Sequence, residues 1–174
     1  MEPILDKARA GQNALERLAS AIPGFKGYRE RELRRDADRE QREHLAGRLE
    51  ANKKALNELA DQATRGGALD AINDVETARK RLDRVAARLR YAERGYSGFF
   101  DVVKVDEAVL GRVYELDLSL LEGVGAVRSA TEAARAAGPE AVRPALKAVT
   151  AAVDALDARL TERDAILHGV VQGG

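Results

Sequence analysis

The chain has 174 residues, a third of them charged, and 29 basic side chains balance 29 acidic ones. Zero net charge removes any general electrostatic argument for nucleic acid or an anionic membrane as a partner, so such a partner would need a local patch. The absence of cysteine excludes disulfides, thiol nucleophiles and cysteine-ligated metals. No apolar run approaches the roughly 18 residues of a membrane span, and Met1–Pro3 does not begin a signal peptide. We therefore expect a cytoplasmic protein without a membrane span.

The first predicted element is an amphipathic helix over residues 4–21. Its apolar side chains recur at helical spacing: Ile4, Leu5, Ala8, Leu15, Leu18, Ala19 and Ile22. Its polar face carries balanced charges and lacks the aromatic anchor that holds a helix on a membrane surface. We interpret it as a helix that faces the protein core.

Residues 22–28 are predicted to form a loop, because Pro23 stops the helix and two glycines frame two aromatic residues. A long second helix follows over residues 29–64. Its first half is nearly all charged, which indicates a solvated helix that either protrudes or packs on one narrow edge. Its apolar stripe returns only from Leu45. A pair of glycines after Arg65 ends it, as expected for a C-cap.

A third helix is predicted over residues 68–93, where apolar residues alternate by three and four positions as in a coiled-coil seam. The next stretch, residues 95–105, contains Tyr96, Phe99 and Phe100 among glycines and a serine. We interpret this stretch as a shaped loop and not as a helical turn.

The fourth predicted helix, residues 107–137, is the most hydrophobic and is therefore expected at the centre of a bundle. Gly138-Pro139 breaks the chain, and a fifth helix follows near Pro144. A second heptad line runs along this helix, with Arg163 at one seam position. Residues 170–174 are expected to fray.

These elements predict an all-α protein with one domain over residues 1–174, an elongated antiparallel bundle of four to five helices with coiled-coil-like seams. If the helices alternate up and down, loops 22–28 and 95–105 lie at the same end. That end would gather most of the aromatic residues, including a candidate partner surface of Phe25, Tyr28, Tyr96, Phe99 and Phe100. These side chains either form a small core that joins helix ends or receive a partner protein.

The strongest signal for an anionic partner lies between Arg79 and Arg94, where seven basic residues outnumber two acidic ones. A basic stripe on one helical face is formed by Lys80, Arg81, Arg84 and Arg88. This basic stripe could bind nucleic acid or another anionic surface. We favour a second interpretation, in which the six acidic residues between Asp101 and Glu122 neutralise the stripe within the molecule.

Catalytic and metal chemistry find little support in the residue pattern. A helical di-iron site needs Glu-x-x-His motifs, which the sequence lacks, and His44 and His168 each have one carboxylate a helical turn away, half a site at best. Ser97 lacks the glycine spacing of a nucleophile elbow, and both histidines belong to helices predicted elsewhere. We therefore predict no catalytic, cofactor-binding or metal-binding residues.

Three stretches of the sequence resemble an uncharacterised family of small prokaryotic all-helical proteins. They are Ile22-Pro23-Gly24-Phe25-Lys26-Gly27-Tyr28, Arg34-Arg35-Asp36-Ala37-Asp38 and Tyr96-Ser97-Gly98-Phe99-Phe100-Asp101. The similarity covers roughly residues 20–120. It implies that the loops are features of the family, and it carries no activity.

The sequence thus predicts a non-catalytic protein–protein interaction or scaffold module, whose partner is another protein or a second copy of the chain. The first alternative is nucleic-acid or anionic-surface binding through the basic stripe, within residues 79–94. The second alternative is an enzyme of unknown type.

Overall fold

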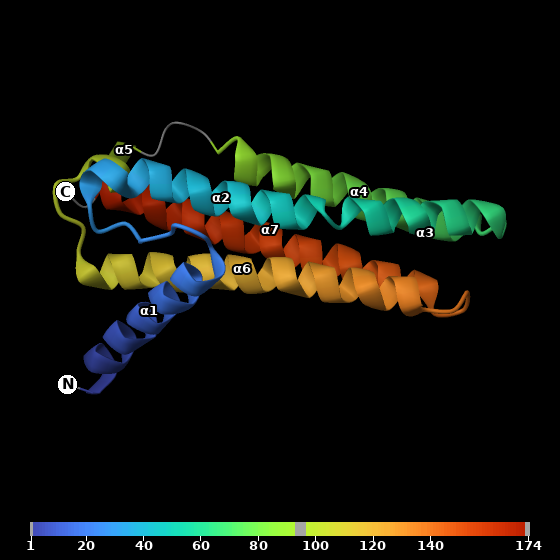
Figure 1. Cartoon of the computed structure of the whole chain (residues 1–174), viewed down its shortest axis with the longest axis horizontal. Coiled ribbons are helices and arrows are strands. Elements are labelled where there is room, and N and C mark those ends of the chain that lie inside the picture. The colour runs from blue at the N-terminus through green and yellow to red at the C-terminus, as the bar shows by residue number, and fades with distance from the viewer. Residues whose placement is uncertain (1, 93–96, 173–174) are drawn as a thin grey trace. The chain divides into compact units, whose positions relative to one another are not determined.

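The computed structural model describes residues 2–92 and 97–172, and every regular element in these residues is a helix (Figure 1). The helices are α1 (Glu2–Ala21), a 3-10 helix (Arg31–Leu33), α2 (Arg34–Glu50), α3 (Lys53–Arg65), α4 (Leu69–Arg90), α5 (Ser97–Asp101), α6 (Glu107–Ala136) and α7 (Val142–Gln172). None of these described helices combines the length and the apolar character needed to cross a membrane. The all-α prediction is confirmed for this part of the chain.

Two compact units make up the chain, and each combines segments that are distant in sequence. Unit 1 contains residues 1–44, 92–121 and 159–174, and unit 2 contains residues 45–91 and 122–158. Helices α2, α6 and α7 therefore contribute residues to both units. The elongated bundle of four to five antiparallel helices stays a prediction.

The prediction of a single long helix over residues 29–64 is wrong. The chain forms a 3-10 turn and α2, breaks at Ala51 and Asn52, and continues as α3. Asn52 explains the break. Its backbone N–H and its side-chain Nδ2 both donate to the Leu49 carbonyl, each at 3.1 Å. A side chain that bonds to nearby backbone competes with the regular helical pattern.

The prediction of a loop over residues 95–105 is also wrong in part, because Ser97–Asp101 forms the short helix α5. The Val102 N–H donates to the Gly98 carbonyl at 3.1 Å and extends the helical pattern at its end. Phe99 and Phe100 are buried, and tertiary burial stabilises a helical turn that glycine disfavours locally. Gly95 and Tyr96 lie outside the described residues.

The core of unit 1 contains an aromatic cluster that joins residues 22–28 to α5. Ring centroids are 5.4 Å apart for Phe25 and Tyr28, 5.6 Å for Tyr28 and Phe99, and 5.4 Å for Phe99 and Phe100, each pair edge to face. Such edge-to-face pairs stabilise more than their buried area alone. The prediction that these two aromatic stretches lie together is confirmed for the described residues.

Helices α1 and α6 cross within unit 1 at a pair of glycines. A Cβ placed on Gly11 would lie only 2.6 Å from the Cα of Gly111, so a side chain at position 11 would clash with the backbone of α6. Beyond this crossing the N-terminal part of α1 leaves α6 at an angle (Figure 1).

Substitution of Gly27 by alanine is expected to destabilise the protein more than the same substitution at Gly24. Both glycines have positive φ, +88° and +79°, and this conformation alone costs alanine about 1–2 kcal/mol. Only at Gly27 would the new Cβ also clash, at 2.5 Å from the Tyr114 hydroxyl, which adds about 1–3 kcal/mol. Urea denaturation of the two variants measures the difference, and equal losses would contradict this packing.

In unit 2, helix α4 has two neighbours that run in opposite directions relative to it. It runs antiparallel to the α2–α3 segment, since Glu50 pairs with Arg90 and Lys53 with Asp83. It runs parallel to α7, because ion pairs join its residues in order to residues of α7: Asp74 to Arg143, Arg81 to Asp154 and Arg84 to Asp157. Helix α4 is therefore held on both sides by opposite charges.

Candidate functional site

The four described aromatic residues of the candidate partner surface are buried: Phe25, Tyr28, Phe99 and Phe100. The fifth, Tyr96, lies outside the described residues. Buried rings that contact one another hold the two segments together and do not face a partner. Of the two interpretations, the structure supports the small core for these four residues.

A second set of contacts around this core comes from Arg34, at the start of α2. Its guanidinium is almost fully buried and donates to the carbonyls of Tyr28 at 2.7 Å, Val102 at 2.6 Å and Phe99 at 3.3 Å. Burial lowers the pKa of Arg34 from its usual value. Arg34 thus satisfies carbonyls that helical bonding leaves free, and it fixes residues 22–28 against α5.

The charged start of α2 is packed on one edge, which is one of the two arrangements expected for it from the sequence. Arg34, Asp38 and Gln41 are buried, at spacings of four and three residues that continue into Leu45. The opposite face carries exposed charges, as expected. The sequence did not reveal which residues form this buried face, because two of them, Arg34 and Asp38, are charged.

Beneath this face lies a buried charge cluster that connects α2, α6 and α7 in unit 1. Arg163 donates from Nε to Asp117 Oδ1 and from Nη2 to Asp38 Oδ1, both at 2.6 Å. The Tyr28 hydroxyl donates to Asp117 Oδ2 at 2.5 Å, and Arg42 Nε donates to Asp38 Oδ2 at 2.8 Å. Two arginines and two aspartates thus neutralise each other away from water.

The pKa values of the cluster follow from its burial. Burial raises the pKa of Tyr28 well above its usual value, so its hydroxyl remains a donor to Asp117. Burial also raises the pKa of Asp117, although Arg163 and the Tyr28 hydroxyl stabilise the carboxylate. For Arg163, burial lowers the pKa, but Asp117 and Asp38 outweigh it and raise the pKa well above its usual value.

Sequence reasoning missed this buried charge cluster, although one signal was visible. Arg163 follows Leu156 and Leu160 and precedes Leu167 on the apolar seam of the last helix, and all four are buried. A charge at a seam position needs an opposite charge within reach. Nothing in the sequence identifies Asp38 and Asp117 as those partners, because they lie 125 and 46 residues away.

The basic stripe is paired mainly with α7, so the acids of residues 101–122 were the wrong partners. Arg84 Nη2 lies 2.7 Å from Asp157 Oδ2, Arg88 Nη1 lies 2.5 Å from Asp157 Oδ1, and Arg81 pairs with Asp154. The pKa of Asp157 is lowered because Arg88 and Arg84 outweigh its partial burial. Intramolecular neutralisation accounts for these three arginines, and Lys80 is the one residue of the basic stripe for which the described residues show no ion pair.

An exposed apolar stripe lies at the N-terminal end of α1. Ile4 is 75% exposed and Leu5 is 58% exposed, and residues 3–9 are exposed on all sides. The same stripe is buried further along the helix: Gly11, Ala14, Leu18 and Ile22. The core of unit 1 therefore covers only the C-terminal part of an apolar face that continues beyond it.

Comparisons with known proteins leave this chain without a recognised relative. No family model matches the sequence, and no curated protein or solved structure is significantly similar to it. The resemblance to an uncharacterised prokaryotic family therefore stays a prediction. Within residues 2–92 and 97–172, no three metal-ligating side chains are gathered at one place.

Proposed function

We propose that this chain is a non-catalytic, cytoplasmic scaffold module that associates with a second copy of itself through the N-terminal half of α1. The observation that carries the proposal is the exposed apolar stripe of Ile4, Leu5 and Ala8, which continues the buried seam of the same helix. Such a seam pairs with a matching seam on another helix.

A second copy fits this stripe in both shape and charge. Residues 4, 8, 11, 15, 18 and 22 form one line at alternating spacings of four and three, the geometry of a coiled-coil seam. Asp6 is balanced by basic neighbours in the same turn, and the whole chain is neutral, so two copies approach without net repulsion. Every copy of the chain carries the same stripe, so the matching surface is present wherever the protein is.

The association is expected to be weak. Burying Ile4 and Leu5 of both copies contributes at most about 6–12 kcal/mol, against an association cost of about 4–15 kcal/mol. The dissociation constant should therefore be no tighter than about 1 µM. Weak, concentration-dependent association is the behaviour expected of a module that acts when it is locally concentrated.

Sedimentation equilibrium from micromolar to near-millimolar protein tests the proposal. The wild-type chain should show a concentration-dependent increase in mean mass, and the variant Ile4→Ser/Leu5→Ser should remain a monomer. Both side chains are exposed, so the melting temperature of the variant should stay within a degree or two of wild type. A control variant, Leu69→Ser, removes an exposed apolar side chain outside α1 and should associate like wild type. A wild-type chain that stays monomeric throughout would overturn the proposal.

A further inference from the structure

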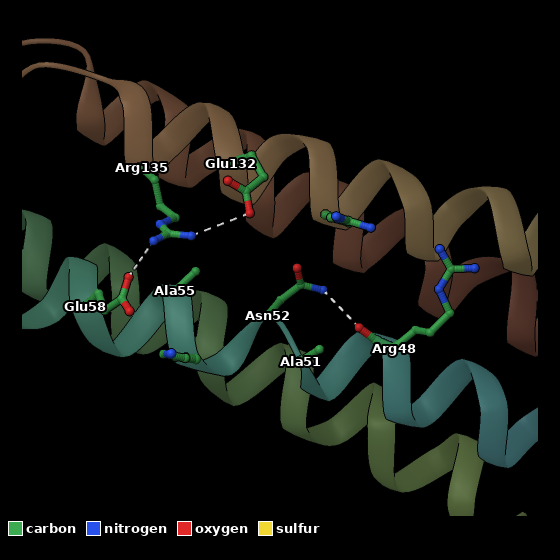
Figure 2. A pocket seen from close by; sticks show the side chains of 9 residues that line it. Arg48, Ala51, Asn52, Ala55, Glu58, Glu132 and Arg135 are labelled. Atoms are coloured by element: carbon green, nitrogen blue, oxygen red, sulfur yellow. Dashed lines mark hydrogen bonds and ion pairs between the residues drawn. The ribbon is translucent and has the colours of Figure 1, made fainter.

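A groove of about 430 Å³ opens in unit 2 beside the break between α2 and α3, and it faces α6 (Figure 2). The break creates the groove because the helix pattern is interrupted at Asn52 and the neighbouring wall positions, Ala51 and Ala55, carry only methyl side chains. Long side chains from α2, α3 and α6 form the rest of its wall.

The groove is lined by more positive than negative charge. Four cations stand against two carboxylates, a net charge of +2 in a chain that is neutral as a whole: Arg48, Lys54, Arg128, Arg135, Glu58 and Glu132. Several basic side chains that converge on a concave space concentrate positive potential there.

Both carboxylates of the groove are already engaged by a single arginine. Arg135 Nη2 lies 2.8 Å from Glu58 Oε2, and its Nη1 lies 3.6 Å from Glu132 Oε1. Figure 2 shows Arg135 reaching between the two glutamates. This leaves Arg48, Lys54 and Arg128 without an ion pair in the described part of the chain, and they come from three different helices.

The groove also offers a hydrogen-bond acceptor. The side-chain Nδ2 of Asn52 donates to backbone carbonyls of its own helix turn, and the side-chain oxygen points into the groove (Figure 2). The groove therefore suits a ligand that carries a hydrogen-bond donor together with anionic groups. A peptide with acidic side chains does so, whereas a nucleic acid presents a dense row of phosphates to a wall that contains two glutamates.

We propose that this groove binds an acidic segment of a partner protein, with its Asp or Glu carboxylates held by Arg48 and Arg128 and a backbone N–H donated to Asn52. Guanidinium groups bind carboxylates in a bidentate geometry that an ammonium group does not reproduce. Binding at this groove goes beyond the proposed self-association, because it adds a second partner and uses residues other than those of α1.

Fluorescence anisotropy with a fluorescein-labelled oligoglutamate peptide tests the groove. Binding to the wild-type chain should be saturable and should weaken as salt is added, because the contacts are between exposed charges. The variant Arg48→Gln/Arg128→Gln should bind the peptide about tenfold more weakly or worse, the loss expected for charge-assisted bonds. Both side chains are exposed and on helices, so circular dichroism should show an unchanged fold.

A matched control removes the same charge elsewhere in unit 2. The variant Arg65→Gln/Lys80→Gln takes away two exposed cations that do not line the groove, and it should bind the peptide like wild type. Equal weakening in both variants would show general electrostatic attraction and overturn the proposal. Absence of peptide binding, or equal binding of an oligoglutamine peptide, would overturn it as well.

Three further measurements distinguish the acidic-segment site from a nucleic-acid site and from the self-association surface of α1. A labelled oligothymidylate that binds more tightly than the peptide, and depends on Arg48 and Arg128, would identify a nucleic-acid site and refute the acidic protein segment. The variant Ile4→Ser/Leu5→Ser should keep its peptide affinity, and the groove variant should keep its self-association. A failure of one property therefore leaves the other measurable.

Discussion

Replacing Arg163 with methionine is expected to lower the free energy of unfolding by about 3–5 kcal/mol, because removal of one partner leaves a buried charge without compensation. Asp117 would lose the guanidinium nitrogen at 2.6 Å and keep only the Tyr28 hydroxyl as a donor. Asp38 would lose Arg163 but retain Arg42 at 2.8 Å. Urea denaturation followed by circular dichroism measures the loss as a lower midpoint.

Two comparison variants decide whether the buried charge, and not the lost side-chain volume, causes this loss. Arg159→Met changes an exposed arginine of the same helix and should alter stability by no more than about 0.5 kcal/mol. The triple variant Arg163→Met/Asp117→Leu/Tyr28→Phe makes the centre of the cluster apolar while Asp38 keeps Arg42, and it should recover most of the loss. Wild-type stability in Arg163→Met alone would show that the cluster is not buried as described.

Truncation of Phe99 to alanine is expected to cost about 3–5 kcal/mol, the usual range for a buried phenylalanine. Its ring is fully buried and contacts Tyr28 and Phe100 edge to face, at 5.6 and 5.4 Å between centroids. The short helix α5 has little intrinsic stability, so the cavity should also loosen its attachment to residues 22–28. Thermal melting should show a decrease of roughly 6–20 °C for a chain of this size.

Tyr91 provides the matched aromatic control for Phe99. Its ring is 79% exposed, so Tyr91→Ala removes a similar side chain with almost no loss of buried area. We expect its melting temperature to stay near that of wild type. A melting temperature of Phe99→Ala equal to that of Tyr91→Ala would show that Phe99 is not part of a core.

The sequence by itself determined the helical class and the positions of most helices. The spacing of apolar residues predicts α1, α4 and α6 nearly to their ends, because a helix buries one stripe and that stripe has a period of 3.6 residues. It also predicts the start of α7, whereas the fraying expected from residue 170 is wrong for residues 170–172, which are helical. The contact of the aromatic stretches around Tyr28 and Phe99 was expected only on the condition that the helices alternate in direction. Connections of alternating direction place every second loop at the same end.

The sequence determined much less at places where the local and the tertiary preferences differ. Gly98 within a five-residue segment indicated a loop, yet the burial of Phe99 and Phe100 makes that segment helical. Asn52 lay within a continuous helical pattern, yet its bonds to Leu49 break the helix and create the groove beside it. The burial of Phe99 and Phe100 and the hydrogen bonds of Asn52 decide these two segments, and the spacing of apolar residues, from which helices were predicted, shows neither of them.

Only the tertiary structure decided which charges are buried and which partner each one has. Sequence reasoning placed Arg34 and Asp38 on a mostly solvated helix and Asp117 beside the basic stripe, whereas the fold buries all three in unit 1. A charge is stable in the interior only when its partner is brought within hydrogen-bonding distance, and for Arg163 and Asp38 that partner is 125 residues away. Sequence spacing carries no information on such a distance, because it is set by the packing of helices and not by the chain between them.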